Sequence, residues 1–70
     1  MTDVMWRLRS LLRSPAAAQR EQFPLIAAEA LASGCTSDEA AAILVVALMR
    51  DLPLPDRVTA KLRDMRDVHH

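Results

Sequence analysis

The sequence predicts a single all-α domain, a compact bundle of four to five short helices around a central apolar helix at about residues 37–50. Two observations predict this fold class. Apolar residues recur at helical spacing, and no segment alternates with period two as a half-buried strand would. The stretch 40–49, AAAILVVALM, is apolar without a break. A helix of this kind is apolar on every side, so its neighbours have to surround it.

The length of the chain limits how well that central helix can be covered. Seventy residues suffice for one domain, so residues 1–70 are assigned to a single helical domain. A core of this size leaves roughly 3–5 kcal/mol of net stability. Its single cysteine cannot form an internal disulfide. Either the neighbouring helices cover the central helix, or one side of it, at Ile43, Val46 or Met49, packs against a second copy or a different protein.

The first helix is expected at about residues 3–13. Its apolar positions share one face: Val4, Met5, Leu8, Leu11 and Leu12. Ser14 and Pro15 then signal a new start, because serine caps helices and proline fits the first helical position. The next turns, with Ala16 to Gln22, form a weak helix.

Pro24 is expected to interrupt that weak helix. Proline disfavours a helical conformation at the residue before it, here Phe23, so a kink or a new start is predicted. A third helix then runs from Pro24 to about Ser33. Gly34 follows at the point where a helix ends in a left-handed turn.

The helix at about residues 37–50 has the clearest signals. Thr36 and Glu39 have the spacing of a capping box, in which each side chain bonds to the backbone of the other residue. Asp38 in the first turn and Arg50 in the last turn both suit the helix dipole. These signals predict one uninterrupted helix.

The last helix is expected at about residues 56–67, after a connection stiffened by Pro53 and Pro55. Its apolar stripe is short: Val58, Leu62 and Met65. The remaining side chains of this helix are mainly charged, with both signs interleaved. Such a pattern is typical of a solvated helix face.

Charge and hydropathy favour a cytoplasmic protein. The formal net charge is zero, which argues against bulk attachment to nucleic acid or to a membrane. Arginines interrupt the apolar positions near the N-terminus, so no secretory signal is predicted. The apolar run 40–49 is too short for a bilayer, which needs about 20 residues. A lone cysteine fits a reducing compartment. The excess of arginine over lysine and the many alanines are typical of bacterial or phage proteins.

The residues needed for catalysis are not expected to come together. Cys35 is the one thiol, and its only histidine partners would be His69 and His70 at the end of the chain. These three residues are also a poor ligand set for a metal. A single glycine rules out a glycine-rich phosphate loop. We therefore predict no enzyme activity, no cofactor and no metal, with Cys35 as a packing residue.

Residues 27–44 loosely resemble a helix-turn-helix, the common DNA-binding motif. Ala30 would lie in the first helix and Gly34 in the turn. The sequence departs from the pattern at Glu29 and Ser33, which occupy positions that usually pack inward. The second helix begins with two acidic residues, which would repel phosphate. A small DNA-binding regulator, using this motif or the arginines of the first helix, is the alternative function.

The side chains most suited to binding a partner lie on the first and last helices. Trp6 lies off the apolar stripe of its helix, three and seven residues before Arg9 and Arg13. Tryptophan and arginine dominate the binding energy of many interfaces. Arg57 and Lys61 are the candidates on the last helix. The alternative for Trp6 is that it folds back over the second or third helix and closes the core.

These observations favour a small non-enzymatic protein-protein interaction module. An adaptor, an inhibitor or a regulatory subunit would present helical surfaces to another protein. The same surfaces give a physical reason for self-association as a homodimer, since the chain is short for its apolar content. Nucleic acid is the second class of partner, and no membrane partner is expected.

Overall fold

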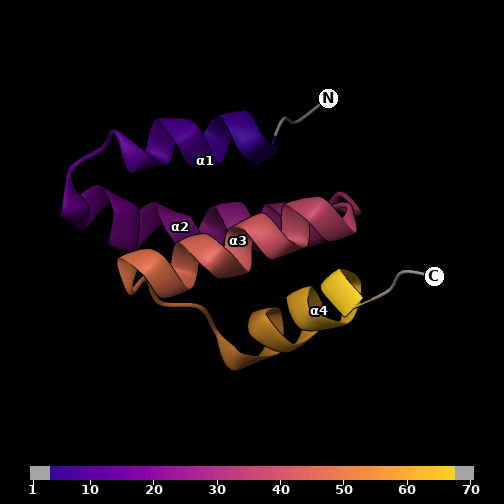
Figure 1. Cartoon of the computed structure of the whole chain (residues 1–70). Coiled ribbons are helices and arrows are strands. Elements are labelled where there is room, and N and C mark those ends of the chain that lie inside the picture. The colour runs from indigo at the N-terminus through magenta and orange to yellow at the C-terminus, as the bar shows by residue number, and fades with distance from the viewer. Residues whose placement is uncertain (1–3, 68–70) are drawn as a thin grey trace.

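The computed structural model describes residues 4–67, which form four helices joined by short connections (Figure 1). The helices are α1 (Val4–Leu12), α2 (Ala16–Ala32), α3 (Ser37–Arg50) and α4 (Asp56–Asp67). The main contacts run from α1 to α2, from α2 to α4, from α4 to α3 and from α3 back to α1. The four helices therefore form a ring around one core, with α1 and α4 on opposite sides. The all-α prediction is confirmed.

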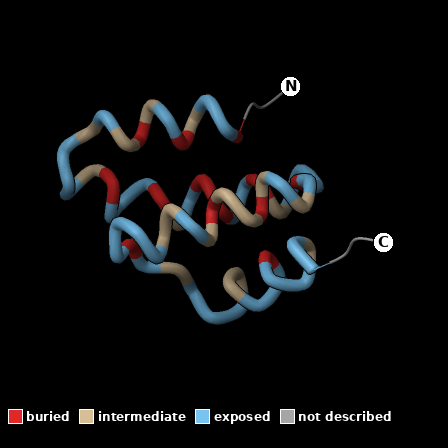
Figure 2. Tube along the Cα trace, in the orientation of Figure 1, coloured by how far each residue is buried: buried red, intermediate tan, exposed pale blue. Residues whose placement is uncertain are grey.

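The core lies between the four helices and draws on each of them (Figure 2). Its largest fully buried side chains are Phe23, Ile43 and Leu62, from α2, α3 and α4 respectively. The first helix adds its predicted stripe in part: Val4, Leu8 and Leu11 are buried. Met5, which the spacing also placed on that stripe, is exposed.

The new helix start predicted at Pro24 is wrong. Helix α2 runs through Pro24 from Ala16 to Ala32, so the two expected helices are one. Proline inside a helix loses one backbone hydrogen bond and clashes with the preceding turn, at a cost of about 3 kcal/mol. Burial of Phe23, Ile26 and Ala27 on the same helix offsets that cost, because each is at most 5% exposed.

The start and end of α3 follow its capping signals. Thr36 Oγ1 accepts a hydrogen bond from the Glu39 amide at 3.1 Å, and Glu39 Oε1 accepts one from the Thr36 amide at 2.8 Å. Gly34 has a φ of 76°, as a helix-terminating glycine should. At the other end Asp51 adopts the left-handed conformation, with a φ of 51°. The helix boundaries predicted for this segment are confirmed.

Of the two alternatives for α3, complete cover by its neighbours and one uncovered side, the structure shows the second. Ala40 and Ile43 are buried in the core, but Leu48 is 84% exposed and Met49 77% exposed. Ile43 therefore has no free side to offer a partner, whereas Met49 has. Helices α4 and α1 are the main neighbours of α3, and together they leave its outer face uncovered.

Candidate functional site

The outer face of α3 carries a row of apolar side chains, which we call the α3 stripe. It consists of Ala41, Val45, Leu48 and Met49. Their spacing of four, seven and eight residues places them on one face of the helix. Val45 is 51% exposed, and Leu48 and Met49 are more exposed still. Contiguous exposed apolar surface of this kind marks binding sites more often than isolated apolar residues do.

A shallow groove lies along one flank of the α3 stripe, between α3 and α4. Its volume is about 350 Å³. Apolar side chains form most of its lining: Leu44, Ala47, Leu48, Leu52 and Leu54. Thr59, Arg63 and Arg66 of α4 complete it. We call this feature the α3–α4 groove, and Leu48 belongs both to it and to the α3 stripe.

The α3–α4 groove is basic as well as apolar, because its lining contains two arginines and no acidic residue. Arg66 Nε donates to Asp67 Oδ1 at 3.1 Å, so its charge is shared with a neighbour outside the lining. Within residues 4–67, Arg63 makes no ion pair. Its guanidinium, on an exposed residue, is therefore available to an acidic ligand.

Helix α1 contacts both α2 and α3. Arg7 and Ser10 of α1 line a pocket together with Gln22 of α2, which shows the side of α1 that faces α2. Met5 and Arg9 lie on the other side of the buried positions of α1, and both are exposed.

The Trp6 side chain is not part of the buried core, but it does pack against a neighbouring helix. Its side chain is 63% exposed and lines a pocket with Gln22 and Ile26 of α2. Beside it, Arg7 donates to Glu29 at 2.6 Å, which ties α1 to α2 and accounts for the glutamate among apolar neighbours. Trp6 therefore packs partly over α2 and keeps a large exposed surface. Its role in binding stays a prediction.

The five residues predicted to bind a partner are all exposed, but they do not form one site. Trp6, Arg9 and Arg13 belong to α1, whereas Arg57 and Lys61 belong to α4 on the opposite side of the bundle. A single small partner could not contact both groups through one continuous patch.

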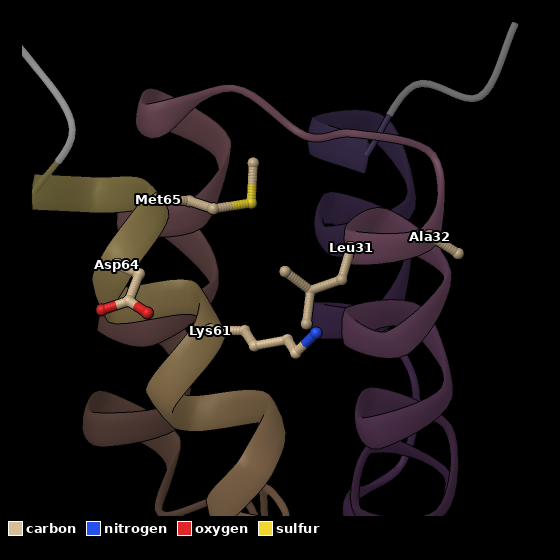
Figure 3. A pocket seen from close by; sticks show the side chains of 5 residues that line it. All are labelled: Leu31, Ala32, Lys61, Asp64 and Met65. Carbon is tan, nitrogen blue, oxygen red and sulfur yellow. The ribbon is translucent and has the colours of Figure 1, made fainter.

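Lys61 instead lines a cavity of about 470 Å³ between α2 and α4 (Figure 3). Its amine extends toward Leu31, and the Met65 side chain points into the same space. Asp64 points away from the cavity toward solvent. The lining offers one cation and apolar surface, with no second polar group directed at the amine, so we assign this cavity no ligand.

Cys35 is a packing residue in a protected position. It is buried, and its Sγ donates to Met65 Sδ at 3.6 Å. Burial raises the pKa of the thiol, and the nearby carboxylate of Glu39 raises the pKa further, while a backbone hydrogen bond opposes both. The thiol is therefore held in its protonated, unreactive form. The histidines once considered as its partners, His69 and His70, lie outside the described residues.

The described residues contain neither a candidate metal site nor a helix that could span a membrane. No group of three or more His, Cys, Asp or Glu side chains within residues 4–67 could hold a metal ion. None of the helices α1 to α4 combines the length and the apolar composition needed to cross a bilayer.

Sequence reasoning missed most of the residues of the α3 stripe and the arginines beside it. The run 40–49 is apolar at every position, so its periodicity carries no information about which face is buried. Of the stripe, Met49 alone was singled out. The sequence did contain one signal for an uncovered face. The other helices have too little apolar surface to cover all sides of α3. Arg63 and Arg66 gave no signal of their own, since they are spaced among aspartates.

Three comparisons, with protein-family models, with curated proteins and with solved structures, found no match for this chain.

Proposed function

We propose that this protein is a non-enzymatic interaction module that docks on another protein through the α3 stripe. The observation that carries the proposal is the exposure of Val45, Leu48 and Met49 on one helix face, in a chain whose other apolar side chains are mostly covered. Burying such side chains contributes about 25 cal/mol per Å² of apolar area, so covering them would be favourable. An adaptor, an inhibitor or a regulatory subunit would use the surface in this way.

The chemistry of the exposed face favours protein over DNA as the partner. A helix that reads DNA presents polar and basic side chains to base edges and phosphates. The outer face of α3 presents aliphatic side chains, and the first turn of this helix carries Asp38 and Glu39. These carboxylates would repel a phosphate backbone. The helix-turn-helix alternative has no comparable supporting observation.

The proposal is tested by comparing what three immobilised forms of the protein retain from an extract of its own cells. The forms are the native chain, the double variant Leu48→Ser/Met49→Ser and the control Leu25→Ser. Leu25 is an exposed leucine on α2, so the control removes exposed apolar area from a different helix. We expect a protein that the native chain and the control retain and the double variant does not. Identical sets of retained proteins from all three forms would refute the proposal.

A matched folding control accompanies the capture. Since Leu48 and Met49 contribute little to the core, the double variant should keep its far-ultraviolet circular dichroism spectrum. A lost partner together with an unchanged spectrum then assigns the loss to the surface.

A further inference from the structure

We propose that the α3 stripe and the α3–α4 groove together bind an amphipathic helix of a partner protein, one whose apolar row is bordered on the side facing α4 by aspartate or glutamate side chains. This inference rests on the proposed function and specifies the chemistry of the partner. It follows from the shape of the surface and from the charges that border it.

The shape of the surface suits a helix. The α3–α4 groove runs beside Leu44, Ala47 and Leu48, and Leu48 joins it to the α3 stripe. From Ala41 to Met49 the stripe extends over about two turns, or roughly 12 Å at 1.5 Å per residue. A helix laid into a groove between two helices presents apolar anchors at the same spacing of three, four and seven residues. The occupant therefore needs an apolar row of about two turns or more.

The charges of the surface determine which residue types can border the apolar row of the partner helix. Arg63 and Arg66 stand in the lining of the groove, on the α4 side of the stripe. Within the described residues Arg63 makes no ion pair. Carboxylates on the side of the partner's apolar row that faces α4 would meet these guanidinium groups, which bind carboxylates with two parallel hydrogen bonds. Lysine or arginine at the same places would be repelled.

Asp38 limits where those carboxylates can lie. It is exposed in the first turn of α3, three residues before Ala41. The carboxylates of the partner are therefore favoured beside Arg63 and Arg66, and not beside the start of α3.

The test uses two synthetic fluorescent peptides of about 18 residues, long enough to form a helix on binding. Both carry leucine at helical spacing, and they differ in having glutamate or lysine at the flanking positions. Binding is followed by fluorescence anisotropy. We expect the native protein to bind the glutamate peptide roughly tenfold more tightly than the lysine peptide. Added salt should reduce this difference, because the flanking charges are exposed.

Variants locate the effect on the surface. Arg63→Glu should weaken binding of the glutamate peptide by about tenfold and strengthen binding of the lysine peptide. The control Arg20→Glu makes the same charge change at an exposed residue of α2, outside the groove lining, and should alter neither affinity by more than about twofold. Leu48→Ser should weaken both peptides, since it removes apolar contact.

Four results would overturn the inference. Equal binding of the two peptides would do so, as would equal effects of Arg63→Glu and Arg20→Glu. Binding to vesicles of anionic lipid that depends on Leu48, without a preference between the peptides, would assign the surface to a membrane. A dimer in sedimentation that Leu48→Ser disperses would assign it to a second copy. Cellular capture that depends on Leu48 and Met49, found together with equal peptide binding, would refute this inference and leave the proposed function standing.

Discussion

Gln19 shows how much one polar side chain contributes to this small fold. It is buried, and its Nε2 donates to the carbonyl oxygens of Ser14 at 2.9 Å and Leu12 at 3.3 Å. The last carbonyls of a helix have no partner within the helix, so α1 needs such a donor where it ends. Because Gln19 belongs to α2, its side chain fixes the turn between the first two helices. Nothing in the local sequence distinguishes it from Gln22, which is exposed.

Replacement of Gln19 should therefore destabilise the protein although no apolar contact is lost. Gln19→Leu leaves the two carbonyls without their donor, and we expect the free energy of unfolding to fall by about 1–3 kcal/mol. Gln22→Leu, on the exposed side of the same helix, should change it by less than about 0.5 kcal/mol. Urea titrations followed by circular dichroism measure both values. Equal midpoints for the two variants would show that the hydrogen bonds of Gln19 contribute nothing.

Cys35 supplies a prediction about pH. Because burial and Glu39 raise the pKa of the thiol in the folded protein, the neutral form is favoured on folding. The resulting stabilisation is present below the pKa of the unfolded chain, about 8.5, and is lost as the pH rises through the folded pKa. The urea midpoint of the native protein should fall more between about pH 8 and pH 10 than that of Cys35→Ala.

The same thiol should react slowly with a disulfide reagent at about pH 8, where the urea-unfolded chain reacts fast. Equal rates in the folded and unfolded protein would show that Cys35 is accessible and that its pKa is not raised.

At the scale of the elements, α2 shows packing overriding a local preference. Proline disfavours a helical conformation at Phe23, yet Phe23 is fully buried and helical. A break there would remove Phe23 or Ile26 from the core, because both lie on the inner side of one continuous helix. The helix therefore retains an unfavourable residue at a position that is only partly buried.

The substitution Pro24→Ala tests this account of α2. It restores a backbone donor inside the helix, so we expect the free energy of unfolding to rise by about 1–3 kcal/mol, the upper value being the cost of proline in a helix interior. Loss of the proline's restriction on the unfolded chain reduces the gain. Leu25→Ala, at the neighbouring exposed position, is the control and should have little effect. A Pro24→Ala variant less stable than the native protein would show that α2 is not strained at this point.

The elements also show how far the sequence alone could lead. Thr36, Glu39 and Gly34 mark their helix ends through local hydrogen bonds and backbone conformation, so the bounds of α3 were predictable. The continuity of α2 was not, because it depends on what Phe23 contacts across the core. The exposed face of α3 was not either, since an apolar run has no preferred side until its neighbours are placed. Helix ends that depend on local hydrogen bonds could be predicted from the sequence. The faces that neighbouring helices cover could not.

At the scale of the whole molecule, four short helices can enclose a core of side chains between them. They are too few to cover any one of the four helices on every side. Each helix of the ring has two main neighbours and one outer face. Polar residues make up most of the outer face of α4, whereas the outer face of α3 is aliphatic. Because Leu48 and Met49 are exposed, they contribute little to the small net stability expected of a 70-residue domain. This asymmetry between the two sides of α3 is what connects the fold to the proposed binding function.

The two sides of α3 should accordingly differ in what they contribute to stability. Ile43 is fully buried, so Ile43→Ala should lower the free energy of unfolding by about 2–5 kcal/mol, most of what a domain of this size has. Leu48→Ala, one helix face away, should change it by less than about 0.5 kcal/mol because Leu48 is already exposed. Circular dichroism at low protein concentration, with and without urea, separates the two outcomes. If Leu48→Ala were as destabilising as Ile43→Ala, and the loss grew on dilution, the outer face of α3 would be part of the protein's own oligomer.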